Sequence, residues 1–441
     1  MAGESSLLNS KALTKIQSIV LACIIAVATI SGIATYYLLS HPSTSSETIK
    51  IGVCADLDGA GGQSLYQQAV LAVEHVNAEG GVLGMKLEIV AEDDGSETFP
   101  ADIAVASSAM TKLITVDKAD YIIGYVTYIP VYQEIVAEHK KILFDTNSLL
   151  DEYSQKVLDD YDRYKYYFRV GNPNFTSAQE GTADSMVVCR ELTGFNKVAL
   201  VSNPFWGAEG LSNFANSLEE VGFEVVYQAD IPFDTVDFTS YFANAEEAGA
   251  EILGVMGIFH DQACIPFVNE YYTRQSPMIM WGNVFSAQYP YFWEATEGKC
   301  EYVTSIAYPT TVGYPFTSKT LAFREAYLER WGGIIPNGAV YDTVRYILVD
   351  AIKRAGTTET EAVIKALETT DIETSLVRRF VFTSSHDIMI GEAGPNRPGE
   401  DYFLVTMFQW QDGKQVPIYP KEIMEEAGVT YKFPDWAGAW D

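Results

Sequence analysis

The chain has 441 residues and a formal net charge of −30, from 59 acidic and 29 basic side chains. Such an acidic surface excludes the basic footprint that nucleic acids require, and it disfavours charge-driven docking on anionic lipid. A hydrophobic content of 48% with 20% charged residues is typical of a packed globular protein, and the length suffices for two or three domains.

The N-terminal region predicts a single-pass membrane anchor. Residues 1–18 are polar, whereas residues 19–39 are almost entirely apolar, which is long enough to span a bilayer and longer than the roughly 7–15 apolar residues of a cleaved signal. Because Lys11 and Lys15 precede the span, we expect a cytoplasmic N-terminus and a globular part outside the cell. The V-L-A-C sequence that ends at Cys23 also resembles a lipobox, so lipid attachment at this cysteine is the alternative.

A Ser/Thr-rich linker at 40–47 leads into a complete βαβ unit at 49–94. The β-branched run I-K-I-G-V predicts a strand that stops at a glycine-rich turn, D-G-A-G-G. Apolar residues then recur at helical spacing from Leu65 to Val76, with Gln67 and Gln68 largely on the other side, and L-E-I-V predicts a second strand. Two strands of one sense joined by a helix imply a parallel sheet covered by helices.

The same alternation continues and predicts two α/β regions. In the first, we expect helices at 102–113 and 131–139, strands at 121–124, 142–144 and 168–170, and a variable helix or loop at 149–167. In the second, we expect helices at 177–192, 207–221, 238–248 and 264–272 and strands at 198–201, 224–227, 252–256 and 277–281. Residues 303–307 then lead back to the first region, which helices at 318–331, 338–355 and 359–369 complete. A hairpin at 402–419 with an Asp412-Gly413 turn follows, and an aromatic tail is expected to pack on the second region.

The βαβ segment carries a family resemblance. Its glycine-rich loop, the helix ending in N-A-E-G-G, the V-L-G-M-K-L-E-I-V strand and the paired Asp93-Asp94 resemble the start of type I periplasmic-binding proteins. Within that family, the segment is most similar to the branched-chain amino-acid and amide binders (the Leu/Ile/Val-binding type) that serve ABC importers. The similarity continues in order to about Trp410, where F-Q-W-Q-D-G-K-Q-V-P-I-Y-P resembles the family's closing hairpin.

The resemblance implies an α/β fold of two Rossmann-like lobes with parallel sheets, joined by three hinge crossings and preceded by the N-terminal transmembrane helix. The crossings are expected near Arg169, Ile306 and Tyr402. The implied domains are 48–169 with 307–400 for lobe one and 170–306 with 401–441 for lobe two.

The motifs of the chain favour binding over catalysis, so we expect a non-enzymatic protein without a metal or cofactor. The five cysteines form no C-x-x-C, and the five histidines share no metal-ligand spacing. Ser64 occupies the third position of a dinucleotide fingerprint, which favours a ligand-facing lip of backbone N–H groups, or a plain tight turn, over a nucleotide cradle. Cys264 and Cys300 could form a disulfide, although buried free thiols are favoured. Asn174 begins a glycosylation sequon.

Aromatic and amide residues recur at the carboxyl ends of successive predicted strands. Ligands of open α/β sheets bind beyond these ends, and an apolar pocket with a few convergent polar groups is the general form of a small-ligand site. The predicted ligand-binding residues are Tyr125, Thr127, Tyr128, Asn147, Ser148, Phe205, Trp206, Phe259, His260, Asn283, Phe285, Tyr341 and Asp342.

The resemblance assigns roles to some of these residues. The family places a ligand carboxylate against hydroxyls and backbone N–H groups of two lobe-one loops, here those at 127–128 and 147–148. It usually meets the ligand ammonium with an acid in a lobe-two loop, where this chain has Asn283. Because a buried ammonium needs charge compensation, either Asp342 or Asp261 supplies the charge or the ligand is not an ordinary α-amino acid.

Together these features predict the extracytoplasmic solute-binding component of an ABC importer at the cell membrane. It would capture a small polar ligand (an amino acid, an amide or a related metabolite) by hinge closure and present it to a permease. The alternative is a ligand-sensing ectodomain that partners a signalling protein, which the absence of a cytoplasmic domain after the hairpin disfavours.

Overall fold

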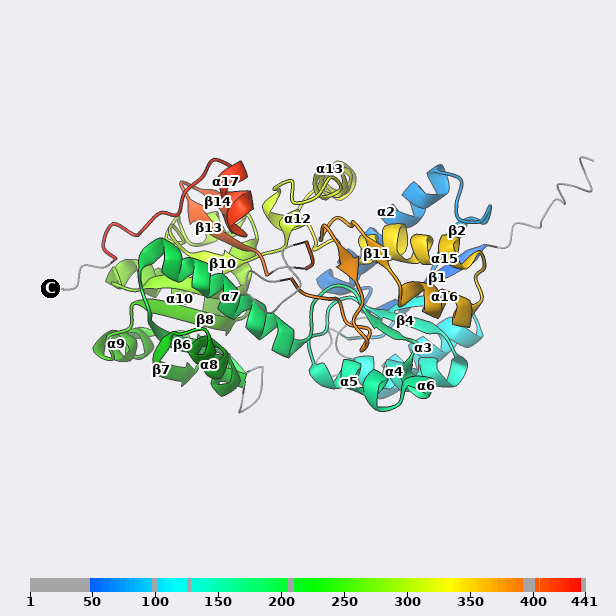
Figure 1. The fold of residues 1–441 in the computed structure, drawn as a ribbon, viewed down its shortest axis with the longest axis horizontal. Helices are drawn as coiled ribbons and strands as arrows, with labels where there is room; N and C mark the ends of the chain where they lie inside the picture. The colour runs from blue at the N-terminus through cyan, green and yellow to red at the C-terminus, as the bar shows by residue number, and fades with distance from the viewer. Residues whose placement is uncertain are drawn as a thin grey trace, which may run out of the picture. The chain divides into compact units, whose positions relative to one another are not determined.

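The computed structural model describes residues 48–96, 102–124, 128–204, 210–391, 401–403 and 405–437. These residues form an α/β fold with two principal sheets flanked by helices (Figure 1). The predicted membrane span at 19–39, Cys23 and the linker at 40–47 lie outside the described residues. Across the described ranges, no helix has the length and apolar content needed to cross a membrane.

The first sheet has five parallel strands in the order β2-β1-β3-β4-β5. The strands are β1 (Ile49–Ala55), β2 (Leu87–Asp93), β3 (Tyr121–Gly124), β4 (Ile142–Asp145) and β5 (Tyr167–Arg169). Its helices are α2 (Ala60–Ala78), α3 (Ile103–Thr115), α4 (Ile129–His139), α5 (Asp151–Asp159), α6 (Tyr161–Tyr164), α13 (Thr320–Trp331), α14 (Ala339–Asp342), the π-helical η4 (Thr343–Leu348), α15 (Val349–Ala355) and α16 (Thr360–Leu367). We call these elements lobe one.

The turn between β1 and α2 shows how local chemistry sets the fold. The Asp56 carboxylate accepts the backbone N–H groups of Asp58 at 3.2 Å and Gly59 at 2.8 Å. A Cβ on Gly62 would lie 1.9 Å from the Asp56 carbonyl oxygen, so a glycine is required where α2 passes the end of β1. The predicted βαβ unit is confirmed, with β1 and β2 in parallel register from Ile49↔Leu87 onward.

Helices cover both faces of the first sheet (Figure 1). On one face, α3, α4 and α5 pack against the strands and α6 packs on α4 and α5, whereas on the other face α2 packs on β1 and β2 and contacts α13, α14 and η4. Strand residues such as Val53, Ile123 and Phe144 are at most 1% exposed in the resulting core. Burial on both faces is the physical basis of the near-continuous apolar strand sequences.

The second sheet has seven strands in the order β14-β13-β10-β9-β8-β6-β7. The strands are β6 (Lys197–Ser202), β7 (Glu224–Asp230), β8 (Ile252–Ile258), β9 (Ile279–Val284), β10 (Thr304–Ile306), β13 (Met407–Gln411) and β14 (Lys414–Tyr419). Its helices are α7 (Phe175–Thr193), α8 (Gly210–Glu220), α9 (Thr239–Glu247), α10 (Asp261–Arg274), η3 (Phe285–Gln288), α11 (Phe292–Ala295) and α17 (Lys421–Glu426). We call these elements lobe two. Its strands pair in parallel except at β10–β13 and β13–β14, which are antiparallel.

Side-chain alternation along β6 divides the interior of lobe two into two cores. Ala199 and Val201 belong to the cluster packed under α9 and α10, whereas Val198 and Leu200 belong to the cluster under α7 and α8. The predicted aromatic tail packs on this lobe, with the ring of Trp436 at 5.3 Å from that of Tyr272.

The chain passes between the lobes three times: after β5, after β10 and before β13. Residues 303–307 were expected to lead back to lobe one, which they do, but no strand was predicted there, and Thr304–Ile306 is strand β10, held between β9 and β13. Three residues are too short a run for a periodic signal, so pairing with both neighbours decides this strand. Two small elements complete the fold near these passages: α12 (Pro309–Val312) and the two-stranded sheet of β11 (Asp371–Ile372) with β12 (Phe380–Val381).

The cysteines and the sequon take structural positions. The four described cysteines (Cys54, Cys189, Cys264 and Cys300) are buried free thiols, so Cys264 and Cys300 form no disulfide. Asn174 caps α7, because its Oδ1 accepts the Ser177 N–H at 2.9 Å, while its Nδ2 donates to Asp387 at 2.9 Å. The asparagine of the sequon is therefore part of the hydrogen-bonding of the first passage.

Candidate ligand-binding site

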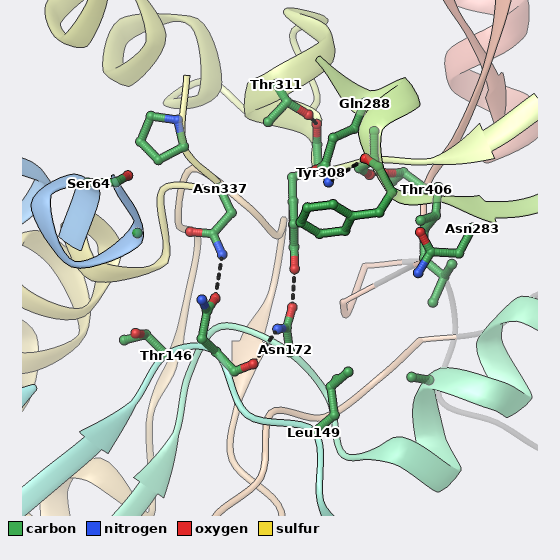
Figure 2. A pocket seen from close by; sticks show the side chains of 18 of the residues that line it. Ser64, Thr146, Leu149, Asn172, Asn283, Gln288, Tyr308, Thr311, Asn337 and Thr406 are labelled. Atoms are coloured by element: carbon green, nitrogen blue, oxygen red, sulfur yellow. Dashed lines mark hydrogen bonds between the residues drawn. The ribbon is translucent and has the colours of Figure 1, made fainter. Parts of the chain in front are cut away.

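A cavity of about 640 Å³ lies between the two sheets, lined by both lobes and by all three passages (Figure 2). Lobe one contributes the first turns of α2, the loop after β4 and the segment before α14, and lobe two contributes the first turns of α7 and the ends of β8 and β9. The passages contribute Asn172 and Pro173, then residues 306–309, then Phe403, Val405 and Thr406. This volume falls in the range of small-molecule sites.

The predicted glycine-rich lip reaches this cavity. Ala60 and Gly61 line it at the start of α2, and Ser64 follows on the same helix (Figure 2). A second glycine shapes the opposite wall, because a Cβ on Gly282 would lie 2.0 Å from the Val255 carbonyl oxygen. Backbone from both lobes thus borders the cavity, and at Gly282 no side chain would fit.

Carboxamides dominate the polar lining. Nine of them face the cavity: Gln63, Gln67, Gln68, Asn147, Asn172, Gln179, Asn283, Gln288 and Asn337. The described lining residues include no Asp, Glu, Lys, Arg or His. The described part of the chain also holds no group of three or more His, Cys, Asp or Glu residues that could bind a metal ion. The site therefore offers dipoles, and a carboxamide can both donate and accept.

Some of these carboxamides are bonded to one another across the passages. Asn337 Nδ2 donates to Asn147 Oδ1 at 3.3 Å, and Asn172 Nδ2 donates to the Asn147 carbonyl oxygen at 3.1 Å. The Tyr308 hydroxyl donates to Asn172 Oδ1, and dashed lines in Figure 2 mark this series of hydrogen bonds. Burial raises the pKa of Tyr308, so its hydroxyl keeps its proton and acts as a donor at neutral pH. These hydrogen bonds connect the first passage to the second.

Three other lining groups are left with unpaired oxygens. Gln68 Oε1 and Thr146 Oγ1 in lobe one and Asn283 Oδ1 in lobe two have no hydrogen-bond partner within the described residues. Gln68 is only 2% exposed and Thr146 only 1%. Figure 2 shows Thr146 and Asn283 on opposite sides of the cavity. Leaving a buried acceptor unpaired costs about 1–3 kcal/mol, and a ligand donor in the cavity could recover that free energy at these three atoms.

The lobe-two side of the cavity carries an aromatic wall, which we define as Phe259, Phe285 and Tyr289. The rings of Phe259 and Phe285 lie 5.9 Å apart at an interplanar angle of 46°, and those of Phe285 and Tyr289 lie 5.9 Å apart at 78°. Because β8 and β9 are adjacent parallel strands, the residues that follow them meet at the same edge of the sheet. The wall offers ring faces to an apolar or planar group.

Four predicted site residues line the cavity, namely Asn147, Phe259, Asn283 and Phe285. Four others, Tyr125, Thr127, Phe205 and Trp206, lie outside the described residues. Five are described but are not among the lining residues: Tyr128, Ser148, His260, Tyr341 and Asp342. Their surroundings explain why.

Tyr128 is the 3% exposed N-cap residue of α4, with its ring 6.1 Å from that of Tyr132. The Ser148 hydroxyl donates to Asp145. His260 is an exposed N-cap residue at positive φ (68°) before α10. Asp261, the other carboxylate proposed as a charge donor, accepts the Tyr291 hydroxyl at 3.0 Å and does not line the cavity.

Tyr341 and Asp342 face the interior of lobe one. The Tyr341 hydroxyl lies 2.7 Å from His75 Nδ1 of α2. The Asp342 carboxylate accepts the backbone N–H groups of Ser375 and Leu376 at 2.9 and 3.1 Å, and burial raises its pKa to about 6. Asp342 therefore does not contact a ligand in this cavity.

Sequence reasoning missed the α2 carboxamides and the passage residues. It placed Gln68 on the side of the helix away from the apolar stripe, and that prediction is wrong for Gln68, which is buried against the cavity. Asn172-Pro173 and Tyr308-Pro309 are hydrogen-bonding residues followed by proline at the first two passages. That shared pattern was the available signal, since proline fixes a turn and leaves the preceding residue extended.

A family model described as periplasmic binding protein matches residues 48–398. The chain belongs to this family. A Leu/Ile/Val-binding protein homologue from Brucella abortus is 24% identical over 368 residues, which cover 79% of this chain and 85% of the relative.

Solved structures similar to this one confirm the fold. One from Silicibacter pomeroyi, provisionally assigned as a branched-chain amino acid ABC transporter, superposes with a TM-score of 0.76 at 21% identity, covering 88% of this chain and all of the other. A branched-chain amino acid transporter substrate-binding protein from Streptococcus pneumoniae, in complex with isoleucine, superposes at 0.63 with 21% identity, covering 84% and 98%. The predicted family and the two-lobed α/β fold are thus confirmed.

Proposed function

We propose that this protein is the extracytoplasmic solute-binding component of an ABC importer, in which a small ligand binds in the cavity between the lobes. One observation carries the proposal: a single cavity is lined by both lobes and by all three passages. A ligand in contact with every connecting segment can favour one lobe arrangement over another through contacts that exist in only one of them. The relatives named as binding proteins of transporters support the same function.

The passages would act as the hinge. The Asn147–Asn172–Tyr308 hydrogen bonds couple the first and second passages directly at the cavity floor. A ligand that contacts these same residues would change the angle between the two lobes. The closed arrangement would be the one presented to a membrane permease. The apolar segment at 19–39 would tether this binding protein to the membrane by a single pass, which places the ligand site outside the cell.

The test is a ligand screen on the purified full-length protein in detergent. A thermal-shift panel of amino acids, carboxamides, carboxylates and aromatic metabolites should contain at least one ligand that raises Tm, since a ligand at a hundred times its Kd adds about 2.7 kcal/mol of stability. Small-angle scattering should show a smaller radius of gyration with that ligand. A panel in which no compound binds would overturn the proposal, and binding without compaction would overturn the hinge mechanism.

A further inference from the structure

The unpaired oxygens that line the site come from both lobes. Gln68 Oε1 and Thr146 Oγ1 belong to lobe one, where both residues are at least nine-tenths buried, and Asn283 Oδ1 belongs to lobe two. All three residues line the cavity, and none of these atoms has a hydrogen-bond partner within the described ranges. Unlike the unpaired polar atoms elsewhere in the described residues, these three border the cavity, so a ligand there can supply the missing hydrogen-bond donors.

The two carboxamide oxygens distinguish between ligand charges. A ligand carboxylate carries acceptors only, so it can accept from a side-chain carboxamide N–H but cannot supply the donor that Gln68 Oε1 and Asn283 Oδ1 lack. A ligand ammonium carries donors only, and its burial needs a compensating negative charge, whereas the Asn283 side chain supplies a dipole. A carboxamide, lactam or urea group carries both an N–H and a C=O, so it can pair in both directions with a side-chain carboxamide.

The rest of the lining indicates the body of the ligand. Phe259 and Phe285 lie beside Asn283, with ring centroids 5.9 Å apart, and present faces on which a flat group can stack. Met256 and Ile306 continue the apolar surface on the same side. A volume of about 640 Å³ accommodates a molecule of drug-like size, which is larger than a bare amide or urea.

We propose that this site binds an uncharged ligand that carries a carboxamide, lactam or urea group on a planar or apolar body. The polar group pairs with Gln68 and Asn283, and the body lies against the aromatic wall. The inference rests on the proposed function, because it names the chemical class that this binding protein captures. It distinguishes the chain from its isoleucine-bound structural neighbour, whose ligand is an amino acid.

The test compares ligands that differ only in charge. Isothermal titration of the full-length protein with benzamide against benzoate, and with nicotinamide against nicotinate, isolates the effect of the polar group, and L-leucine serves as the zwitterionic reference. We expect each amide to bind at least about tenfold more tightly than its carboxylate partner and than L-leucine, a factor of ten being one well-made hydrogen bond. Equal or tighter binding of a carboxylate or of leucine would overturn the inference while leaving the proposed function intact. Failure of both amides, with another class of compound bound, would do the same, and failure of every compound would overturn both.

Matched variants locate the contacts. Gln68→Met and Asn283→Leu remove the acceptor oxygen while keeping a similar side-chain shape, and each should weaken amide binding about tenfold. Asn283→Asp keeps an acceptor oxygen at the same position and should lose less affinity than Asn283→Leu. Gln155→Met is the control, because Gln155 is exposed on α5 and does not line the cavity, so affinity should stay within about threefold of the wild type. Far-UV circular dichroism and Tm report the folding of each variant, and unchanged affinity in folded Gln68→Met and Asn283→Leu would overturn the assignment.

Discussion

Two buried polar regions of this protein differ in whether each polar atom has a hydrogen-bond or ion-pair partner within the protein. The first surrounds Arg169 at the end of β5, where the side chain is fully buried. Its guanidinium donates to the carbonyl oxygens of Ser148 at 2.8 Å and Leu150 at 2.6 Å and to the Ser154 hydroxyl at 3.0 Å. Its Nε lies 2.6 Å from Asp387 Oδ1, as an ion pair without the alignment of a hydrogen bond.

The second region is the cavity wall, where Gln68, Thr146 and Asn283 carry unpaired oxygens. The two regions are close in sequence, because Thr146 and Ser148 belong to the same loop after β4. This loop therefore has two roles. The Ser148 carbonyl oxygen belongs to the Arg169 network at the start of the first passage, and the Thr146 hydroxyl is available to a ligand. Completed networks resist change, whereas incomplete ones have free energy to gain from binding.

Arg169→Met tests the completed network and should have the largest effect. It leaves the Asp387 carboxylate buried without its charged partner, which we expect to cost about 3–5 kcal/mol of unfolding free energy, measured by urea denaturation. Arg163→Met is the control, because the Arg163–Glu134 pair spans 2.7 Å with side chains 53% and 43% exposed, so its loss should lower stability far less than Arg169→Met does. Similar losses in the two variants would remove the distinction between the regions.

Asp342→Asn tests whether Asp342, which was predicted to bind ligand, instead has a structural role like that of Arg169. The pKa of Asp342 is raised to about 6 by burial, so the folded protein holds this proton more tightly than the unfolded chain does. The protonated Asp342 therefore contributes fully to stability below about pH 4, and this contribution is lost as the pH rises through 6. Between pH 4 and pH 7 the wild type should lose about 3 kcal/mol of unfolding free energy from this group, and the variant should not. Denaturation at both pH values measures the difference. Ligand affinity should not change, and weaker ligand binding by the variant would show that Asp342 belongs to the ligand site.

Tyr308→Phe tests the link between the two regions at the passages. Losing the hydroxyl leaves Asn172 Oδ1 without this donor, and we expect a loss of about 1–2 kcal/mol in a thermal or urea melt. The control is Tyr161→Phe, whose hydroxyl donates to Glu368 on the surface and whose removal should stay within about 0.5 kcal/mol. If Tyr308→Phe matches this control, the passage contact does not contribute to stability.

Gln68→Met gives the smallest change, and its sign is opposite to the others. Replacing a buried, unpaired carboxamide oxygen with a thioether of similar length removes a desolvation penalty, so we expect the protein without ligand to gain about 1 kcal/mol. Differential scanning calorimetry measures the gain. A loss of stability would mean that Gln68 makes a structural hydrogen bond and belongs with the Arg169 network.

The elements of this fold were largely predictable because their signals are local. Periodic apolar residues defined α2, and the Asp412-Gly413 turn defined the closing hairpin, with φ angles of 51° and 77° as such a turn requires. Strand β10 was missed because three residues carry no period. The helix expected at 338–355 is interrupted by the π-helical η4, whose backbone shift leaves no mark in the apolar stripe.

The site was predictable only in part. Asn147, Phe259, Asn283 and Phe285 line the cavity because the carboxyl ends of parallel strands meet at one edge. The same rule cannot tell which way a helix-start residue faces, and the packing of α14 against α2 turns Tyr341 toward His75, away from the cavity. Periodicity likewise could not separate a carboxamide facing solvent from one facing a cavity, as at Gln68.

By itself, the sequence determined the order and type of most elements, the parallel sheets and the family, because these follow from short-range periodicity, turn chemistry and motif order. Only the tertiary structure decided which polar atoms are paired. Asn172 and Tyr308 are separated by 136 positions and meet at the cavity floor, and Arg169 and Asp387 meet across a still longer stretch of chain. Pairing of this kind depends on distance and direction in three dimensions, which no local pattern encodes.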